Sequence, residues 1–149
     1  VIFGGYHPEA SKIVTQMRKK RMNTYFISDD GVKDDTFIKV AGKYAEGVYA
    51  TGPKDTSTNP ISKAAVAAHK QAFSADPGAF YENAYAAAQA LLNAVDKADS
   101  TDMAAVRKAL QSNDVDTPVG SIRFDERGDA VGVGFAMYQV KDGQYVEVK

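Results

Sequence analysis

The sequence predicts an α/β fold with a parallel sheet, and three features indicate it. Short apolar runs typical of strands alternate with amphipathic segments typical of helices over residues 1–51. Alanine-rich helical segments follow in the middle of the chain, and residues 120–149 alternate between apolar and polar side chains. We therefore expect a doubly wound parallel sheet followed by a tail of antiparallel β-hairpins.

The first third of the chain carries the parallel pattern. In order, the expected elements are a strand over 1–3, a helix over about 8–21, a strand over 24–27, a helix over about 34–40 and a strand over 47–51. Pro8 suits the first turn of its helix, because the N–H that proline lacks has no partner there. The basic residues 18–21 complement the helix dipole and face water, which we favour over a nucleic-acid patch.

A polar segment rich in turn-forming residues, 52–60, separates this part from the alanine-rich helices. Helices are expected over 60–73, 80–98 and 102–112, and strands over 121–124, 131–140 and 145–148. The second of these helices should bury one stripe of its surface. That stripe consists of Tyr81, Ala84, Tyr85, Ala88, Leu91, Leu92 and Val95.

Composition excludes several classes of function. A formal charge of −1 and a pI near 6.1 give no electrostatic footprint for nucleic acid, so no nucleic-acid partner is expected. No apolar run approaches the roughly 20 residues of a membrane span. The absence of cysteine excludes disulfides, thiol nucleophiles and zinc–thiolate sites.

The chain also lacks the usual signatures of enzymes. No Gly-x-Ser-x-Gly elbow is present, and the two histidines, His7 and His69, are far apart, with His69 expected on the surface of a helix. Two distant histidines and scattered carboxylates form no recognisable metal set. Residues 132–134 resemble part of a dinucleotide fingerprint but precede no helix. We therefore expect no enzyme activity, no cofactor and no metal.

Two loops at the carboxyl ends of strands are the candidate ligand site. Gly4 and Gly5 lead from the first strand to Tyr6 at the start of a helix, and the second strand ends at Asp29 and Asp30. Ligands of open α/β sheets bind at this edge. Taken alone, Tyr6 is better explained by simple packing at a helix start, and the aspartates by backbone hydrogen bonding in a turn.

Several segments, in this order and spacing, resemble the carboxyl-terminal part of the branched-chain amino-acid binding proteins, the receptors of ABC importers. The segments are 3–9 (FGGYHPE), 30–32 (DGV), 45–48 (AEGV), 76–77 (DP), 79–80 (AF), 85–91 (YAAAQAL), 120–125 (GSIRFD) and 128–129 (GD). The resemblance covers nearly all 149 residues.

The resemblance implies the fold of a type I periplasmic binding protein, which has two Rossmann-like lobes joined by three crossovers. It assigns residues 1–52 to lobe 2, 53–132 to lobe 1 and 133–149 to lobe 2 again. Because the chain starts inside an apparent strand, we expect a missing amino-terminal segment of the same protein to supply the rest of lobe 1 and the start of lobe 2.

The resemblance also implies the ligand contacts. The family has an aromatic residue at Tyr6 and an acid at Asp30 that pairs with the α-ammonium of an amino acid, and an aromatic residue near the ligand at Phe80. Phe80 is equally compatible with a packing role at a helix start. Many branched-chain receptors have glutamate in place of Asp30 and tyrosine in place of Phe80, so the reach of the acid and the hydroxyl chemistry differ here.

The implied function is that of a periplasmic solute-binding receptor. It would capture an amino acid, aliphatic or branched-chain, by lobe closure and deliver it to the membrane permease of an ABC transporter. The alternative is a ligand-sensing domain of a regulator or receptor with the same fold. A signal peptide in the preceding segment would favour the first, and a helix-turn-helix the second.

Overall fold

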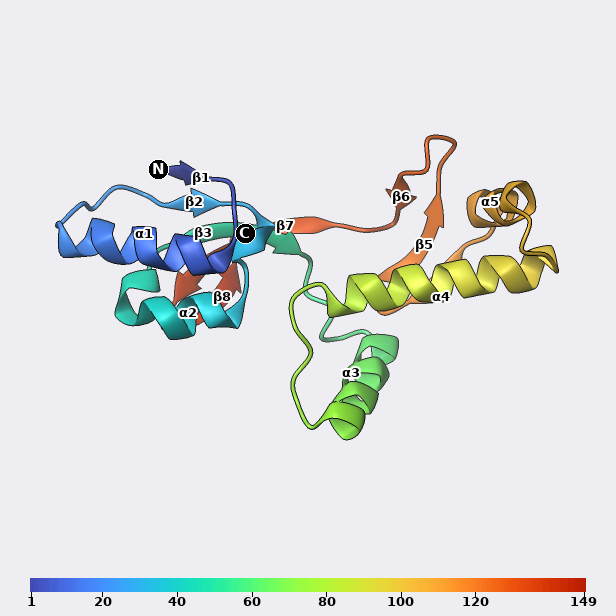
Figure 1. Cartoon of the computed structure of the whole chain (residues 1–149), viewed down its shortest axis with the longest axis horizontal. Helices are drawn as coiled ribbons and strands as arrows, with labels where there is room; N and C mark the ends of the chain where they lie inside the picture. The colour runs from blue at the N-terminus through green and yellow to red at the C-terminus, as the bar shows by residue number, and fades with distance from the viewer. The chain divides into compact units, whose positions relative to one another are not determined.

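The computed structural model describes all residues 1–149 and divides the chain into two compact units. Unit 1 comprises Val1–Lys54 and Phe135–Lys149, and unit 2 comprises Asp55–Gly134. The second unit is thus an insertion between the two segments of the first, as the colours along the chain in Figure 1 show.

Unit 1 is built on a mixed five-stranded sheet in the order β1-β2-β3-β7-β8. Its strands are β1 (Ile2–Phe3), β2 (Ile27–Ser28), β3 (Tyr49–Pro53), β7 (Phe135–Lys141) and β8 (Gln144–Glu147). The first three are parallel, whereas β7 is antiparallel to β3 and β8 is antiparallel to β7. The parallel β-α-β-α-β order and the closing hairpin are confirmed.

The two helices of unit 1, α1 (His7–Lys19) and α2 (Asp35–Ala41), lie on the same side of the sheet (Figure 1). Two short 3₁₀ helices, η1 (Asp30–Val32) and η2 (Gly42–Ala45), flank α2. One core joins these elements to the sheet. Its buried members are Ala10, Val14, Met17, Phe26, Val32, Phe37, Ala41, Ala45, Val48, Ala50 and Val140.

Both helices of unit 1 cover the same face of the sheet. The strands β1, β2 and β3 are parallel and lie side by side in this order, so right-handed crossovers place both connecting helices on one face. The other face carries a row in register across the five strands, namely Ile2, Ile27, Tyr49, Gln139 and Val146. Ile2 is 88% exposed and Val146 42%, so this face carries apolar side chains that the chain leaves in contact with solvent.

Unit 2 combines three helices with a small antiparallel sheet in the order β4-β5-β6. Its elements are α3 (Pro60–Phe73), α4 (Tyr81–Ala98), α5 (Met103–Ser112), β4 (Val115–Thr117), β5 (Gly120–Phe124) and β6 (Ala130–Val131). Asn59 caps α3 by accepting a hydrogen bond from the Ile61 amide, and it donates to the carbonyls of Thr117 and Pro118. Its side chain therefore ties the start of the unit to its sheet.

The predicted buried stripe of α4 is wrong for most of its members, although Val95 at its end packs against a core. The helix buries Ala86, Ala90 and Ala94 against Ile122 and its surroundings, and it leaves Leu92 70% and Leu91 50% exposed. At 100° per residue the buried alanines lie on the side opposite the predicted stripe. The helix thus places small side chains on its buried side and its large apolar side chains on the exposed side.

Smaller differences concern element ends and one histidine. The second strand comprises Ile27–Ser28, later than expected, and the short strand β4 was not predicted. His69, expected on the surface of its helix, is half-buried there, because its ring packs 4.8 Å from the ring centroids of both Phe73 and Tyr81. Arg18 at the end of α1 donates to the carbonyls of Met22 and Thr24, so it closes the helix end.

Two absences hold for the whole chain. None of the helices combines the length and the apolar character that a membrane crossing requires. No three histidine or acidic side chains gather in a way that could hold a metal ion.

Candidate functional site

The first loop of the site leads from β1 into α1. Tyr6 is the N-cap residue of α1 and has an extended backbone, with φ −109° and ψ 164°. Its carbonyl accepts the Ala10 amide at 3.1 Å, which begins the helix. The backbone is thus fixed while the Tyr6 ring remains 72% exposed at the carboxyl end of β1.

The second loop leaves β2 and forms η1. The Ser28 hydroxyl donates to the Phe3 carbonyl at 2.8 Å, so the ends of β1 and β2 are joined by a side chain as well as by the sheet. Asp29 follows directly, and Asp30, which is half-buried, is the first residue of η1. Both acids therefore lie at the carboxyl edge of the parallel strands, where α/β sheets bind ligands.

Gly31 is the point where the two loops meet. A Cβ placed on Gly31 would lie 2.5 Å from the carbonyl oxygen of Gly5 and 3.1 Å from Cδ1 of Tyr6. Real Cβ atoms essentially never approach to 2.5 Å, so only glycine permits this contact. The structure thus brings the Tyr6 ring next to the residue that follows Asp30.

Asp29 is a second acid at this edge, and no ligand contact is predicted for it. Its Oδ1 lies 3.5 Å from the Ser28 hydroxyl, and its Oδ2 lies 3.7 Å from the position of a Cβ on Gly4. The glycine at position 4 therefore leaves the Asp29 carboxylate close to the backbone of the first loop. The Asp-Asp-Gly run was the sequence signal for a pair of acids here.

Asp34 begins α2 a short distance beyond the second loop. Its carboxylate accepts the Thr36 amide at 2.7 Å. Burial acts to raise its pKa, but the hydrogen bonds from Thr36, with the charges of His7 and Lys39, outweigh burial and hold the pKa below 3.8. Asp34 therefore stays ionised and fixes the start of the helix that follows the site.

Phe80, the third predicted site residue, belongs to unit 2, whereas Tyr6 and Asp30 belong to unit 1. It is the N-cap residue of α4 and has a left-handed backbone, with φ 63° and ψ 11°. Its carbonyl accepts the Ala84 amide at 3.0 Å, and its side chain is half-buried. A non-glycine residue in this region is uncommon and directs attention to the position.

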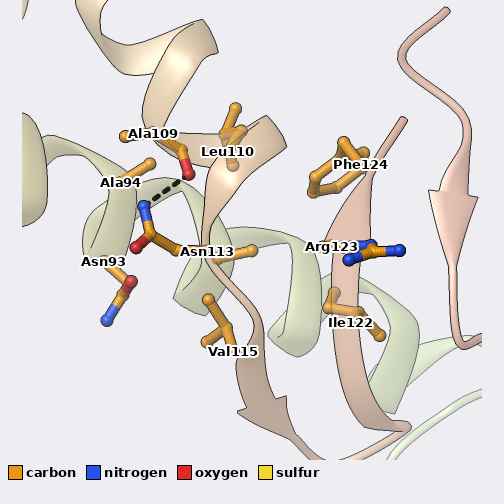
Figure 2. A pocket seen from close by; sticks show the side chains of 10 residues that line it. Asn93, Ala94, Ala109, Leu110, Asn113, Val115, Ile122, Arg123 and Phe124 are labelled. Atoms are coloured by element: carbon orange, nitrogen blue, oxygen red, sulfur yellow. Dashed lines mark hydrogen bonds between the residues drawn. The ribbon is translucent and has the colours of Figure 1, made fainter. Parts of the chain in front are cut away.

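The gap between α4, α5 and β5 is a matter of packing (Figure 2). Ala94 and Ala109 line it together with Phe124, and it has no room for a water molecule. The Asn113 amide, which also lines it, donates to the Ala109 carbonyl at 2.8 Å. This gap offers no space for a ligand.

Comparison with known proteins identifies the family. A family profile described as periplasmic binding protein matches residues 1–144. The chain is 34% identical over 150 residues to the leucine-, isoleucine-, valine-, threonine- and alanine-binding protein of Pseudomonas aeruginosa, covering 100% of this chain and 40% of that protein. It is 37% identical over 138 residues to the Leu/Ile/Val-binding protein of Escherichia coli, covering 93% and 37%.

Solved structures agree with this result. A leucine binding protein from Thermotoga maritima superposes with a TM-score of 0.84 at 26% identity, covering 99% of this chain and 43% of that one. A branched-chain amino acid transporter substrate binding protein from Streptococcus pneumoniae, in complex with isoleucine, shares the fold with a TM-score of 0.79 at 21% identity, covering 99% and 44%. This chain spans about two fifths of the length of the curated relatives that it matches. It belongs to the periplasmic binding protein family.

Proposed function

We propose that this chain is part of a solute-binding receptor that captures an amino acid, aliphatic or branched-chain, and delivers it to the permease of an ABC importer. One observation carries the proposal: the loops of Tyr6 and Asp30 touch at the carboxyl edge of the parallel strands, in a family member whose relatives are named for binding such amino acids. These relatives are named as binding proteins, which supports a role for this chain in binding and not in catalysis.

Asp30 is the proposed partner of the ligand's α-ammonium group. A hydrogen bond to a charged group contributes about 1.5–3 kcal/mol, against roughly 8 kcal/mol for micromolar binding. Tyr6 would supply an exposed aromatic surface beside it, and Phe80 a second aromatic contact. Asp30 should therefore account for a large share of the affinity.

The proposed receptor works by closure of two lobes, with residues 1–52 and 133–149 in lobe 2 and residues 53–132 in lobe 1. The division of the chain at 54/55 and 134/135 supports this assignment. A ligand shifts the population toward a closed form only by contacts that it gains there. The proposed location is the periplasm, where such a receptor meets its permease.

The test is calorimetry on the full-length protein with a panel of amino acids. We expect leucine, isoleucine or valine to bind at micromolar concentration, and Asp30→Ala to weaken binding at least tenfold, about 1.4 kcal/mol. Asp35→Ala is the matched control, because it removes the same charge from an exposed position in the first turn of α2. Equal affinities for both variants would remove Asp30 from the site.

The same panel separates the alternatives. Binding of an amino acid without support of its uptake in a strain that lacks the receptor gene would favour a sensing domain over a transport receptor. Binding of none of the twenty amino acids would overturn the proposal. The 149-residue chain by itself should bind poorly, because the proposed carboxylate contacts of the ligand lie outside it.

We further propose that a missing amino-terminal segment of the same protein covers the outer stripe of α4. The relatives are about two and a half times as long as this chain, and α4 exposes Tyr85, Leu91 and Leu92 opposite its buried alanines. Contact between large apolar side chains and water is unfavourable, and a segment that covers them would remove this cost in free energy.

Leu92→Gln in the full-length protein tests this partner. If the stripe is covered, the free energy of unfolding should fall by about 1.5–3 kcal/mol, the value of burying a leucine side chain. Ala87→Gln is the control, because Ala87 is exposed on the same helix but lies outside the stripe. Equal effects in urea unfolding would show that the stripe stays exposed.

A further inference from the structure

We propose that the carboxyl-terminal hairpin, β7–β8, positions the loop that carries Asp30, through Lys33, Tyr138 and Tyr145. This inference rests on the proposed function in one respect, the role of Asp30 in binding. The three residues are positioning residues, because they act on the loop backbone and not on the ligand.

Tyr145 on β8 makes the first link. Its hydroxyl donates a hydrogen bond of 2.5 Å to the carbonyl of Val32, the last residue of η1, across 113 positions of sequence. Burial, reinforced by the charges of Asp34 and Asp35, raises the pKa of this hydroxyl. The hydroxyl therefore keeps its proton and stays a donor at neutral pH.

Lys33, directly after η1, makes the second link. Its ammonium group lies 4.2 Å from the ring centroid of Tyr138 on β7 and 5.9 Å from that of Tyr145. These distances fall within the range of cation–π attraction. The hydroxyl of Tyr138 donates to the Pro53 carbonyl at 2.6 Å, so the ring that receives the lysine is itself fixed to β3.

A glycine in the sheet makes room for the aliphatic stem of Lys33. The stem passes over Gly52 on β3, where any added Cβ would collide with the Cδ atom of Lys33. Gly52 is buried and has no positive φ, so the glycine leaves room for the lysine stem and does not serve a special backbone conformation. The side chain of Lys33 is thus packed along its length.

Together these contacts hold the second loop from the side of the hairpin. Val32, whose carbonyl accepts the first link, is completely buried, and the Lys33 amide donates back to the Asp30 carbonyl at 3.1 Å. Gly31 meets the first loop on the other side. A loop held in this way spares the ligand the entropy cost of ordering Asp30 when it binds.

The test uses Tyr145→Phe and Lys33→Met in the full-length protein. Each removes one link and keeps most of the side chain. Tyr44→Phe and Lys43→Met are the matched controls, because Lys43 lies 5.4 Å from the Tyr44 ring centroid in a pair outside the loop. For each variant, amide hydrogen exchange of residues 30–34 is measured without ligand. The affinity for leucine is measured by calorimetry.

We expect the two anchor variants to speed amide exchange of residues 30–34 at least tenfold and to weaken leucine binding at least threefold, with both controls unchanged. In an Asp30→Asn background, Tyr145→Phe should no longer change the affinity. If Tyr145 has a purely structural role, Tyr145→Phe should weaken leucine binding in the Asp30→Asn background as well, and this result would overturn the proposal.

The two readouts separate failure of this inference from failure of the proposed function. If the unaltered protein binds no leucine but the anchor variants still speed exchange, the proposed function is wrong and the positioning of the loop stands. If exchange of residues 30–34 is unchanged in both anchor variants, the hairpin does not position the loop, whatever the ligand.

Discussion

Unit 1 and unit 2 use large side chains in opposite ways. The core of unit 1 buries two phenylalanines completely, Phe26 and Phe37, between its helices and its sheet. The cores of unit 2 are centred on alanines of α4 and α5, while Leu91 and Leu92 are half or more exposed. The large apolar side chains of α4 therefore lie on its exposed side, which is the side that we propose a missing segment covers.

The largest expected effect tests the core of unit 1. Phe26→Ala should lower the free energy of unfolding by about 3–5 kcal/mol, because it leaves a cavity at a site that is closed on all sides. The Phe26 ring packs 5.8 Å from that of Phe3, between the first two strands. Urea unfolding provides the measurement, and a loss below about 1 kcal/mol would mean that this core is less well packed than described.

The next effect contrasts the two faces of α4. Ala90→Leu in the 149-residue chain should cost about 1–3 kcal/mol, since Ala90 is 1% exposed and the added atoms have no space. Ala88→Leu, on the exposed side of the same helix, should stay within about 0.5 kcal/mol. Similar losses for both variants would show that the outer stripe is already covered.

The smallest effects compare one helix cap from each unit. Asp34 accepts the Thr36 amide, and Asp102 at the start of α5 accepts the amides of Ala104 and Ala105, both at 3.0 Å. Asp34→Ala and Asp102→Ala should each cost about 1 kcal/mol, while the asparagine variants keep most of the stability. Thermal unfolding of the four variants is the measurement, and an asparagine loss equal to the alanine loss would contradict capping.

The Asp34 cap also predicts a pH dependence. The pKa of Asp34 is lower in the folded chain than its ordinary value of 3.8, so the folded state binds this proton less readily than the unfolded state. Its contribution is present above pH 3.8 and is lost as pH falls through the lower, folded value. The stability difference between the parent chain and Asp34→Asn should therefore shrink in acid, and a difference that grows in acid would be inconsistent with the lowered pKa.

Much of the fold could be predicted from the periodicity of the sequence. Helix α3 begins at Pro60 and ends at Phe73 as expected, because proline at the start and a clear stripe define it. The buried face of α4 could not be predicted, since its large apolar side chains favour the opposite face and sequence does not show which face has a partner within the chain. The strand β4 was missed because only Val115 in its three residues is apolar.

The candidate site was predictable as far as strand order determines it. Tyr6 and Asp30 follow neighbouring parallel strands, so their loops had to lie side by side; their role in binding stays a prediction. The close approach at Gly31 and the links from Lys33 and Tyr145 depend on distances between residues far apart in sequence, which periodicity does not encode. Such contacts appear only when the chain is folded.

The insertion of unit 2 into unit 1 has a consequence for folding during synthesis. The sheet of unit 1 is completed when β3 pairs with β7, and Pro53 and Phe135, which meet in that pair, are separated by the whole of unit 2. All residues of the inserted unit leave the ribosome before β7 does, and domains generally fold as units in the order in which they are made. Unit 2 should therefore gain its structure first, and in doing so it shortens the loop that the last strands of unit 1 must close.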